Sequence, residues 1–412
     1  MTFLFVVAIL FFIDFYVYQP VEVLLRKKSE KFQKYAKRVY WIVPVIPIVA
    51  LVIYQFIDDF NTARYVRYFI VGGFSINYIP KLFTVIFLFI HDVIGLTKWG
   101  VKKAVAKQEH KKEIGSPITR GEFISKVAIL SATAPLALMG FGIVKGAHDY
   151  RVRRRTIFLP NLPKAFDGIK IGQLSDIHTG SFFDKMAVQG GIDLFLGEKP
   201  DVIFFTGDLV NNATREVNEY IDIFSKVKAP LGVYSVTGNH DYGDYSRWPS
   251  QEAKDKNFQD LIQAHQQMGY RLLLDENVPL TVDGESIGII GVENWGAGRF
   301  QKYGDLSKAY QGSEEYPVKI LLSHDPSHWE AQVIPGYKDI DLTLSGHTHG
   351  FQFGVEIGDF RWSPSQYAYK QWADLYKKGE QYIYVNRGFG YIGFPGRVGM
   401  PPELTILELK KG

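Results

Sequence analysis

Five short apolar runs in the second half of the chain each end in a turn rich in polar residues. The runs cover residues 170–174, 201–205, 231–236, 318–322 and 340–344. Between and around them lie segments with helical periodicity, including 184–199, 214–226 and 255–268. This alternation predicts an α/β fold, and in open α/β sheets binding sites are built where strands end and loops begin.

The turns after these runs contribute imidazole, carboxylate and amide groups. They contain Asp176 and His178, then Asp208, then Asn239, His240 and Asp241, then His324, and finally His347 and His349. Five of the ten histidines of the chain fall in these turns. A single one would most often be a satisfied core or surface residue. Their recurrence with Asp and Asn at five strand ends favours a shared metal site instead.

The sequence of the fifth turn restricts its conformation more than that of any other turn in the set. Residues 344–350 read Leu-Ser-Gly-His-Thr-His-Gly. Two histidines one residue apart would point to opposite faces of an extended strand. Gly346 and Gly350 permit a sharp turn that directs both imidazoles toward one point.

The ordered set DxH, GD, GNHD, H and GHxH resembles the calcineurin-like metallophosphoesterase superfamily over residues 151–412. Five spaced motifs in one order make the resemblance specific. The segment from Gly390 to Glu403, which includes Pro395-Gly396-Arg397, is similar to a membrane-anchored bacterial branch. Many relatives read GDxxD where this chain ends the motif in Asn211. The difference implies a changed contact around the ligands and leaves the ligands themselves intact.

The resemblance implies both a fold and a set of ligands. The fold is an α/β/β/α sandwich, preceded here by an N-terminal helical transmembrane region. One metal would be held by Asp176, His178, Asp208 and His349. The other would be held by Asp208, Asn239, His324 and His347, so that Asp208 bridges the two ions.

This ligand set predicts two divalent ions of Mn, Fe or Zn. Imidazole with carboxylate suits these metals better than Mg or Ca, and the chain has no cysteine to offer a thiolate. A bridging carboxylate can hold two cations about 3.5–4 Å apart because its charge offsets their repulsion. Water bound to such a pair becomes a nucleophile near neutral pH, so the expected reaction is hydrolysis of a phosphoester.

Two residues beside the ligands are expected to act without binding metal. His240 would lie near the leaving group and protonate it, or neutralise charge on the phosphoryl oxygens. Asp241 could orient His240, or could be a cap or turn residue. His328, four residues after His324, is expected to lie outside the ligand set, behind it or at the surface.

Two glycine-rich segments with aromatic and basic residues could shape a substrate pocket. Residues 293–303 include Arg299, and residues 386–397 include Arg387 and Arg397. The plain alternative is loop packing, in which glycine makes turns and aromatics fill gaps. Because a guanidinium can bind phosphate through two N–H groups, the three arginines are candidate substrate-binding residues.

Residues 1–150 are expected to form a transmembrane anchor region, separate from a catalytic domain at 151–412. Apolar segments 2–25, 39–57, 65–96 and 123–144 each approach or exceed the ~20 residues that span a bilayer. Segment 65–96 is long and contains Pro80-Lys81, so one kinked helix or two short segments both fit. A single crossing there gives four spans.

Four ionisable residues fall inside these apolar segments, namely Asp14, Lys81, His91 and Asp92. Such groups at membrane depth are functional candidates by default. The alternative is that His91 and Asp92 lie at the interface, while Lys81 snorkels or pairs with Asp14.

The distribution of charge bears on partners and orientation. Residues 1–150 carry 19 Lys/Arg against 10 Asp/Glu, whereas residues 151–412 carry 28 against 33. The acidic second part lacks the basic stripe of a nucleic-acid-binding protein. Residues 26–38 and 98–120 hold seven Lys/Arg each, and such segments face the cytoplasm. With four spans the catalytic domain then lies outside the cytoplasm, although five basic residues between 145 and 155 favour the reverse.

These observations predict a dinuclear phosphoesterase in the bacterial inner membrane, acting on a lipid or envelope-linked phosphoester. One alternative is an enzyme of lipid A biosynthesis similar to UDP-2,3-diacylglucosamine pyrophosphatase, which would need a cytoplasmic catalytic domain. Another is a non-catalytic membrane receptor or scaffold, against which the intact ligands argue. Nothing in the sequence indicates the oligomeric state.

Overall fold

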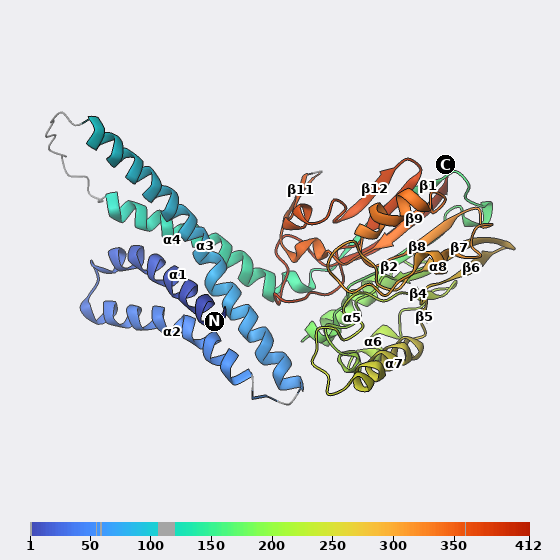
Figure 1. Cartoon of the computed structure of the whole chain (residues 1–412), viewed down its shortest axis with the longest axis horizontal. Helices are drawn as coiled ribbons and strands as arrows, with labels where there is room; N and C mark the ends of the chain where they lie inside the picture. Colours follow the sequence, from blue (N-terminus) through green and yellow to red (C-terminus); the bar gives the residue numbers. More distant parts are fainter. Residues whose placement is uncertain (1, 55, 58–59, 106–119, 359) are drawn as a thin grey trace. The chain divides into compact units, whose positions relative to one another are not determined.

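The computed structural model describes residues 2–54, 56–57, 60–105, 120–358 and 360–412 (Figure 1). The chain divides into two compact units, Met1–Phe141 and Gly142–Gly412. This division falls nine residues before the boundary expected after residue 150.

The first unit consists of long apolar helices. They are α1 (Thr2–Leu25), α2 (Glu30–Tyr54), α3 (Phe60–Val105) and α4 (Arg120–Val144), whose last residues belong to the second unit. Each contains a stretch long and apolar enough to cross a membrane. Helix α3 continues through Pro80 without interruption, so the single-helix alternative for this segment is the one observed.

An ion pair joins two of these helices near their middles. Lys81 Nζ lies 2.5 Å from Asp14 Oδ1, and the Tyr78 hydroxyl donates to Asp14 Oδ2 over 3.0 Å. Pairing offsets the cost of placing either charge among apolar side chains. The alternative in which Lys81 pairs with Asp14 is therefore confirmed.

The second unit contains two six-stranded mixed sheets. The first sheet has the order β1 (Arg151–Leu159), β14 (Glu403–Lys411), β2 (Lys170–Leu174), β3 (Val202–Phe205), β4 (Val233–Ser235), β5 (Arg271–Leu272). The second has the order β12 (Asp374–Lys378), β13 (Gln381–Val385), β9 (Leu342–Ser345), β8 (Lys319–Leu322), β7 (Glu285–Gly291), β6 (Glu276–Val282). Strands β2 to β5 run parallel in the first sheet, as do β13, β9, β8 and β7 in the second.

The two sheets face each other across an apolar core, with helices on the outer faces. Buried side chains of both sheets, among them Phe204, Ile289 and Leu342, form one cluster. Helices α5 (Lys185–Leu196), α6 (Ile221–Phe224) and α7 (Gln251–Met268) cover the outer face of the first sheet (Figure 1). Helix α8 (Leu306–Tyr310) and the turn at Trp329–Val333 cover the second. The predicted α/β/β/α sandwich is therefore confirmed.

Two local expectations differ from the structure. Residues 214–226 form a 3-10 turn, Thr214–Glu216, and the short α6 instead of one helix. The Glu216 carboxylate accepts the backbone N–H groups of Asn211 and Asn212, a local bond that competes with helix formation. The sequence reading also missed a small hairpin of β10 (Val355–Ile357) and β11 (Phe360–Trp362), whose strands have three residues each.

Candidate metal centre

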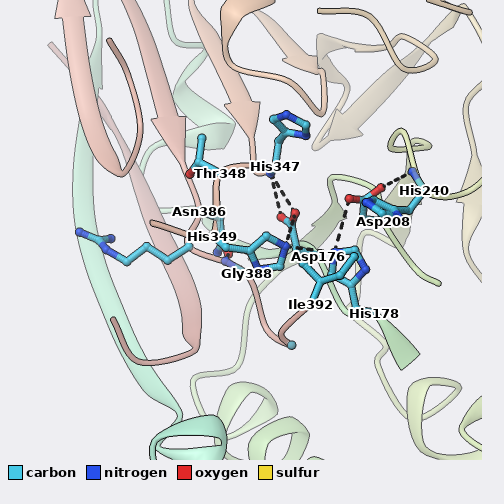
Figure 2. A network of polar contacts seen from close by, with 12 residues as sticks. Asp176, His178, Asp208, His240, His347, Thr348, His349, Asn386, Gly388 and Ile392 are labelled. Atoms are coloured by element: carbon cyan, nitrogen blue, oxygen red, sulfur yellow. Dashed lines mark hydrogen bonds and ion pairs between the residues drawn. The ribbon is translucent and has the colours of Figure 1, made fainter. Parts of the chain in front are cut away.

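Two groups of His and Asp side chains gather where β2, β3, β8 and β9 end. Figure 2 labels Asp176, His178, Asp208, His347 and His349 among them. The first group is Asp176, His178 and His349, and the second is Asp208, His324 and His347. Within each group, one ligand atom from every residue lies within 4.8 Å of the others. Each group could hold a metal ion.

Ring nitrogens face each other in both groups. His178 Nε2 lies 3.0 Å from His349 Nε2, and His324 Nε2 lies 3.3 Å from His347 Nδ1. Two imidazole nitrogens at such distances either share a proton or face a common cation. Two pairs side by side suit a pair of metal ions.

The Asp208 carboxylate lies between the two groups. Its Oδ2 is 3.5 Å from His178 Nε2 in the first group and 3.1 Å from His324 Nε2 in the second. Its Oδ1 accepts the backbone N–H of His240 over 2.9 Å. One oxygen is thus near ligand atoms of both groups, the position that a bridging ligand needs.

Backbone carbonyls fix the orientation of two of the imidazoles. His178 Nδ1 lies 3.2 Å from the Val210 carbonyl, and His324 Nδ1 lies 2.7 Å from the Thr206 carbonyl. Donation from Nδ1 to these oxygens directs both Nε2 atoms at the site, toward Asp208 Oδ2. Outer contacts of this kind are typical of metal-binding histidines.

Asn239 offers an oxygen with nothing bound to it among the described residues. Its side-chain Oδ1 is buried and accepts no hydrogen bond, while its Nδ2 donates to the Tyr245 hydroxyl over 2.8 Å. A buried acceptor without a donor costs ~1–3 kcal/mol unless something else satisfies it. A cation would do so, and the oxygen and nitrogen donors present fit Mn, Fe or Zn.

The charges of the site also favour a cation. Burial opposes ionisation, yet the neighbouring His349 holds the pKa of Asp176 below its usual range. His324 likewise holds the pKa of Asp208 well below its usual range despite burial. Burial lowers the pKa of His324, but Asp208 outweighs that effect and raises it to about 10. The carboxylates therefore remain ionised and available to a metal.

The backbone is left-handed at five of the predicted ligands, with φ from 51° to 71°. They are Asp176, His178, Asp208, His347 and His349. Such conformations cost of order 1–3 kcal/mol each for residues other than glycine and cluster at functional sites. The histidines at 347 and 349 thereby escape the alternation of an extended strand, as expected from the sequence.

Glycine allows two pairs of these turns to approach closely, the turn at Gly346 with that at Asp176 and the turn at Gly238 with that at Asp208. A Cβ on Gly346 would clash with the Asp176 carboxylate, and one on Gly238 would clash with the Asp208 carboxylate. The Asp176 carboxylate also accepts the backbone N–H of His347 over 2.9 Å (Figure 2). The end of β2 and the end of β9 are thereby joined at the site.

Asp241 supports the loop that carries Asp208. Its carboxylate accepts the backbone N–H groups of Gly238, Asp208, Leu209 and Val210 at 2.8–3.3 Å. No described hydrogen bond joins it to the His240 ring. These backbone contacts are those of a turn residue, one of the two roles left open by the sequence.

The guanidinium groups of Arg387 and Arg397 are bound by other groups of the protein. Arg387 is buried and forms ion pairs with Glu403 at 2.5 Å and Glu356 at 2.6 Å. Arg397 is buried and donates to the carbonyls of Arg387, Gly388, Gly390 and Met400. Carboxylates and carbonyls of the protein thus occupy both guanidinium groups that were predicted to bind substrate.

Arg299 lies on an exposed loop next to the site. The ring of the following residue, Phe300, meets that of His347 edge-on with centroids 4.9 Å apart. The Arg299 side chain has no recorded partner among the described residues. It stays a candidate for contact with substrate.

His240 lies beside both metal groups but belongs to neither. Its Nδ1 donates to the Asn211 carbonyl over 2.7 Å, and its ring lies against that of Tyr245 with centroids 4.4 Å apart. With Nδ1 occupied, Nε2 is the atom available for proton exchange. Asn211 thus acts through its backbone, and its side chain donates to Ser181 instead.

His328 is buried behind the site and is not a ligand. Its Nδ1 lies 2.8 Å from Ser323 Oγ, its Nε2 lies 2.8 Å from Gln332 Oε1, and its ring packs on Trp295. Of the two positions expected from the sequence, the buried one is observed.

Two tyrosines near the site were not anticipated. The Tyr369 hydroxyl lies 2.7 Å from His347 Nε2, which leaves Nδ1 of that ring for the metal group. Tyr245 contacts both Asn239 and His240. Neither lies in a turn after a predicted strand, so no motif marks them.

Two family descriptions match the chain. Residues 1–147 match "Probable Calcineurin-like phosphoesterase, transmembrane domain", and residues 169–351 match "Calcineurin-like phosphoesterase". A transmembrane protein with metallophosphoesterase domain from Danio rerio is 30% identical over 79% of this chain and 71% of its own length. The chain belongs to the calcineurin-like metallophosphoesterases.

Another relative of this metallophosphoesterase is bacterial. The uncharacterized metallophosphoesterase YkuE of Bacillus subtilis is 30% identical over 71% of this chain and 98% of its own length. The family and the site agree on a metal-dependent phosphoesterase with a transmembrane region, as predicted.

Replacement of His240 distinguishes between two possible roles of this residue, metal ligand and proton donor. We expect His240→Asn to retain its metal, because His240 lies outside both groups, and to slow phosphodiester hydrolysis by about 10²–10⁴-fold. The slowing should shrink for aryl esters with good leaving groups, which need little protonation. Elemental analysis and a leaving-group series measure the two effects, and loss of metal from the variant would contradict this role.

Proposed function

We propose that this metallophosphoesterase hydrolyses a phosphoester of a lipid or another envelope-linked substrate, with its catalytic unit outside the cytoplasm of a bacterial inner membrane. The observation that carries the catalytic part is Asp208 Oδ2, which lies near ring nitrogens of two separate His–Asp groups. The membrane part is supported by the transmembrane family match and by four candidate spans.

Two divalent ions of Mn, Fe or Zn are proposed as cofactors. Asp176, His178 and His349 would hold one, and His324, His347 and Asn239 the other, with Asp208 shared. When bound, the ions would acidify water and neutralise charge on the phosphoryl group.

The protein's own groups would then position the phosphoester and handle its protons. His240, with Nδ1 fixed by a carbonyl, would give a proton from Nε2 to the leaving oxygen. Asp241 would keep Asp208 in place through the backbone of its loop. Arg299, on the exposed loop beside His347, would bind a charged part of the substrate.

The side of the membrane decides which substrates are reachable. With a continuous α3 there are four candidate spans, and this number supports a cytoplasmic location for the basic segments 26–38 and 98–120. Residues 106–119 of the second segment lie outside the described residues. An envelope substrate follows from this placement, whereas the UDP-2,3-diacylglucosamine alternative would need the opposite one.

A panel of phosphoesters tests the substrate class. In lipid vesicles, we expect the Mn-loaded full chain to cleave a lipid phosphoester at least roughly tenfold faster than a UDP-linked one, a difference of about 1.4 kcal/mol in transition-state binding. Asp208→Asn should abolish both activities, and Asp193→Asn, a change at an exposed residue of α5, should abolish neither. A metal-loaded chain that cleaves none of the substrates would support the scaffold alternative.

A reporter fused after Gly412 tests the side of the membrane. A phosphatase that is active only in the periplasm should be active on the fusion, and a fluorescent protein that matures only in the cytoplasm should be dark. The reverse pattern would contradict the proposed orientation and favour the UDP-linked substrate.

A further inference from the structure

The β10–β11 hairpin carries its apolar side chains outward. Val355 pairs with Trp362 and Ile357 with Phe360, so these four residues share one face. All four are exposed, with Ile357 at 73% and Phe360 at 62%. Six of the thirteen exposed large apolar side chains described in residues 142–412 fall within residues 351–367, so this is a cluster and not scattered exposure.

The opposite face of the hairpin carries charges that point into the protein. Glu356 forms ion pairs with Arg153 of β1 and, at 2.6 Å, with buried Arg387. Its cross-strand partner Arg361 pairs with Asp374 at 3.1 Å. Antiparallel strands at a water-exposed surface normally have polar side chains outside and apolar ones inside. The inverted arrangement indicates that the outer face of this hairpin does not meet water.

The hairpin is fixed to the last turn of a membrane-spanning helix. The Gly142 carbonyl, two residues before the end of α4, accepts the backbone N–H of Arg397 over 3.1 Å. The next residue, Val398, accepts the N–H of Gly354 over 2.9 Å, and Gly354 directly precedes β10.

A second connection runs through β1. It begins at Arg151, seven residues after the end of α4, so at most about 25 Å of extended chain separates them. Arg153, which pairs with Glu356, lies two residues further on. The hairpin therefore belongs to the end of the catalytic unit at which the chain leaves the membrane.

We infer that the outer face of the hairpin, formed by Val355, Ile357, Phe360 and Trp362, rests in the interfacial region of the bilayer that α4 spans. Trp and Phe are suited to this depth, where one side is apolar and the other hydrated. The Trp362 indole N–H donates to the Tyr367 hydroxyl, another side chain suited to this depth. Because His349 lies only six residues before β10, such contact would also hold the metal centre close to the lipid surface.

Site-directed spin labelling tests this contact without any assay of activity. The chain has no cysteine, so Ile357→Cys and Phe360→Cys each provide a single labelling site in the full chain reconstituted in lipid nanodiscs. Phe158→Cys is the matched control, 53% exposed and located near the far end of β1. Collision with oxygen and with a water-soluble nickel complex measures the depth of each label.

We expect labels at 357 and 360 to lie about 5–10 Å below the lipid phosphates and the label at 158 to lie in water. Labels at 357 and 360 that are as accessible to nickel as the control would overturn the inference. Spin–spin broadening that disappears on dilution with unlabelled chain would also overturn it, because a second copy would then cover the face. Neither outcome depends on whether a phosphoester is cleaved, so this experiment tests the inference independently of the proposed function.

Discussion

Asp208 Oδ2 lies 3.5 Å from a ring nitrogen of one His–Asp group and 3.1 Å from a ring nitrogen of the other. A negative oxygen at this point lets two cations approach each other, and without it their repulsion would oppose joint binding. Each group takes residues from both sheets. In the first group Asp176 and His178 follow β2 and His349 follows β9, and in the second Asp208 follows β3 and His324 follows β8. The α/β/β/α sandwich is what brings these strand ends together.

Residues behind the ligands hold this arrangement. Asp241 binds four backbone N–H groups around Asp208, and Arg397 binds five carbonyls, including that of His349. Burial and the nearby Asp208 charge raise the pKa of Asp241 to about 7. The left-handed backbone at the ligands adds strain that the surrounding hydrogen bonds must offset. Supporting contacts of this kind fix the geometry of a metal site as much as its ligands do.

That the candidate ligands gather at one place could be predicted from the sequence, because each follows a short apolar strand and strand ends converge in an α/β fold. The contacts of Arg387 and Arg397 could not be predicted, because Arg387 pairs with Glu356 and Glu403 only in the folded chain and Arg397 binds backbone carbonyls. The hairpin at 355–362 was missed because its strands have three residues each, too few for alternation to stand out. The prediction of one helix over residues 214–226 failed because the Glu216 carboxylate binds a nearby backbone N–H group, that of Asn211. Periodicity predicts the layers, but long-range charge pairing has no periodic signal.

The central claim is that one chain holds two metal ions bridged by Asp208. Electron paramagnetic resonance of the Mn-loaded protein, with metal content from elemental analysis, tests it most directly. The account predicts two Mn per chain with the exchange-coupled spectrum of ions about 3.5–4 Å apart, and loss of the coupling with at least one ion in Asp208→Asn. A single uncoupled Mn in the unaltered chain, or a coupled pair that survives Asp208→Asn, would contradict it.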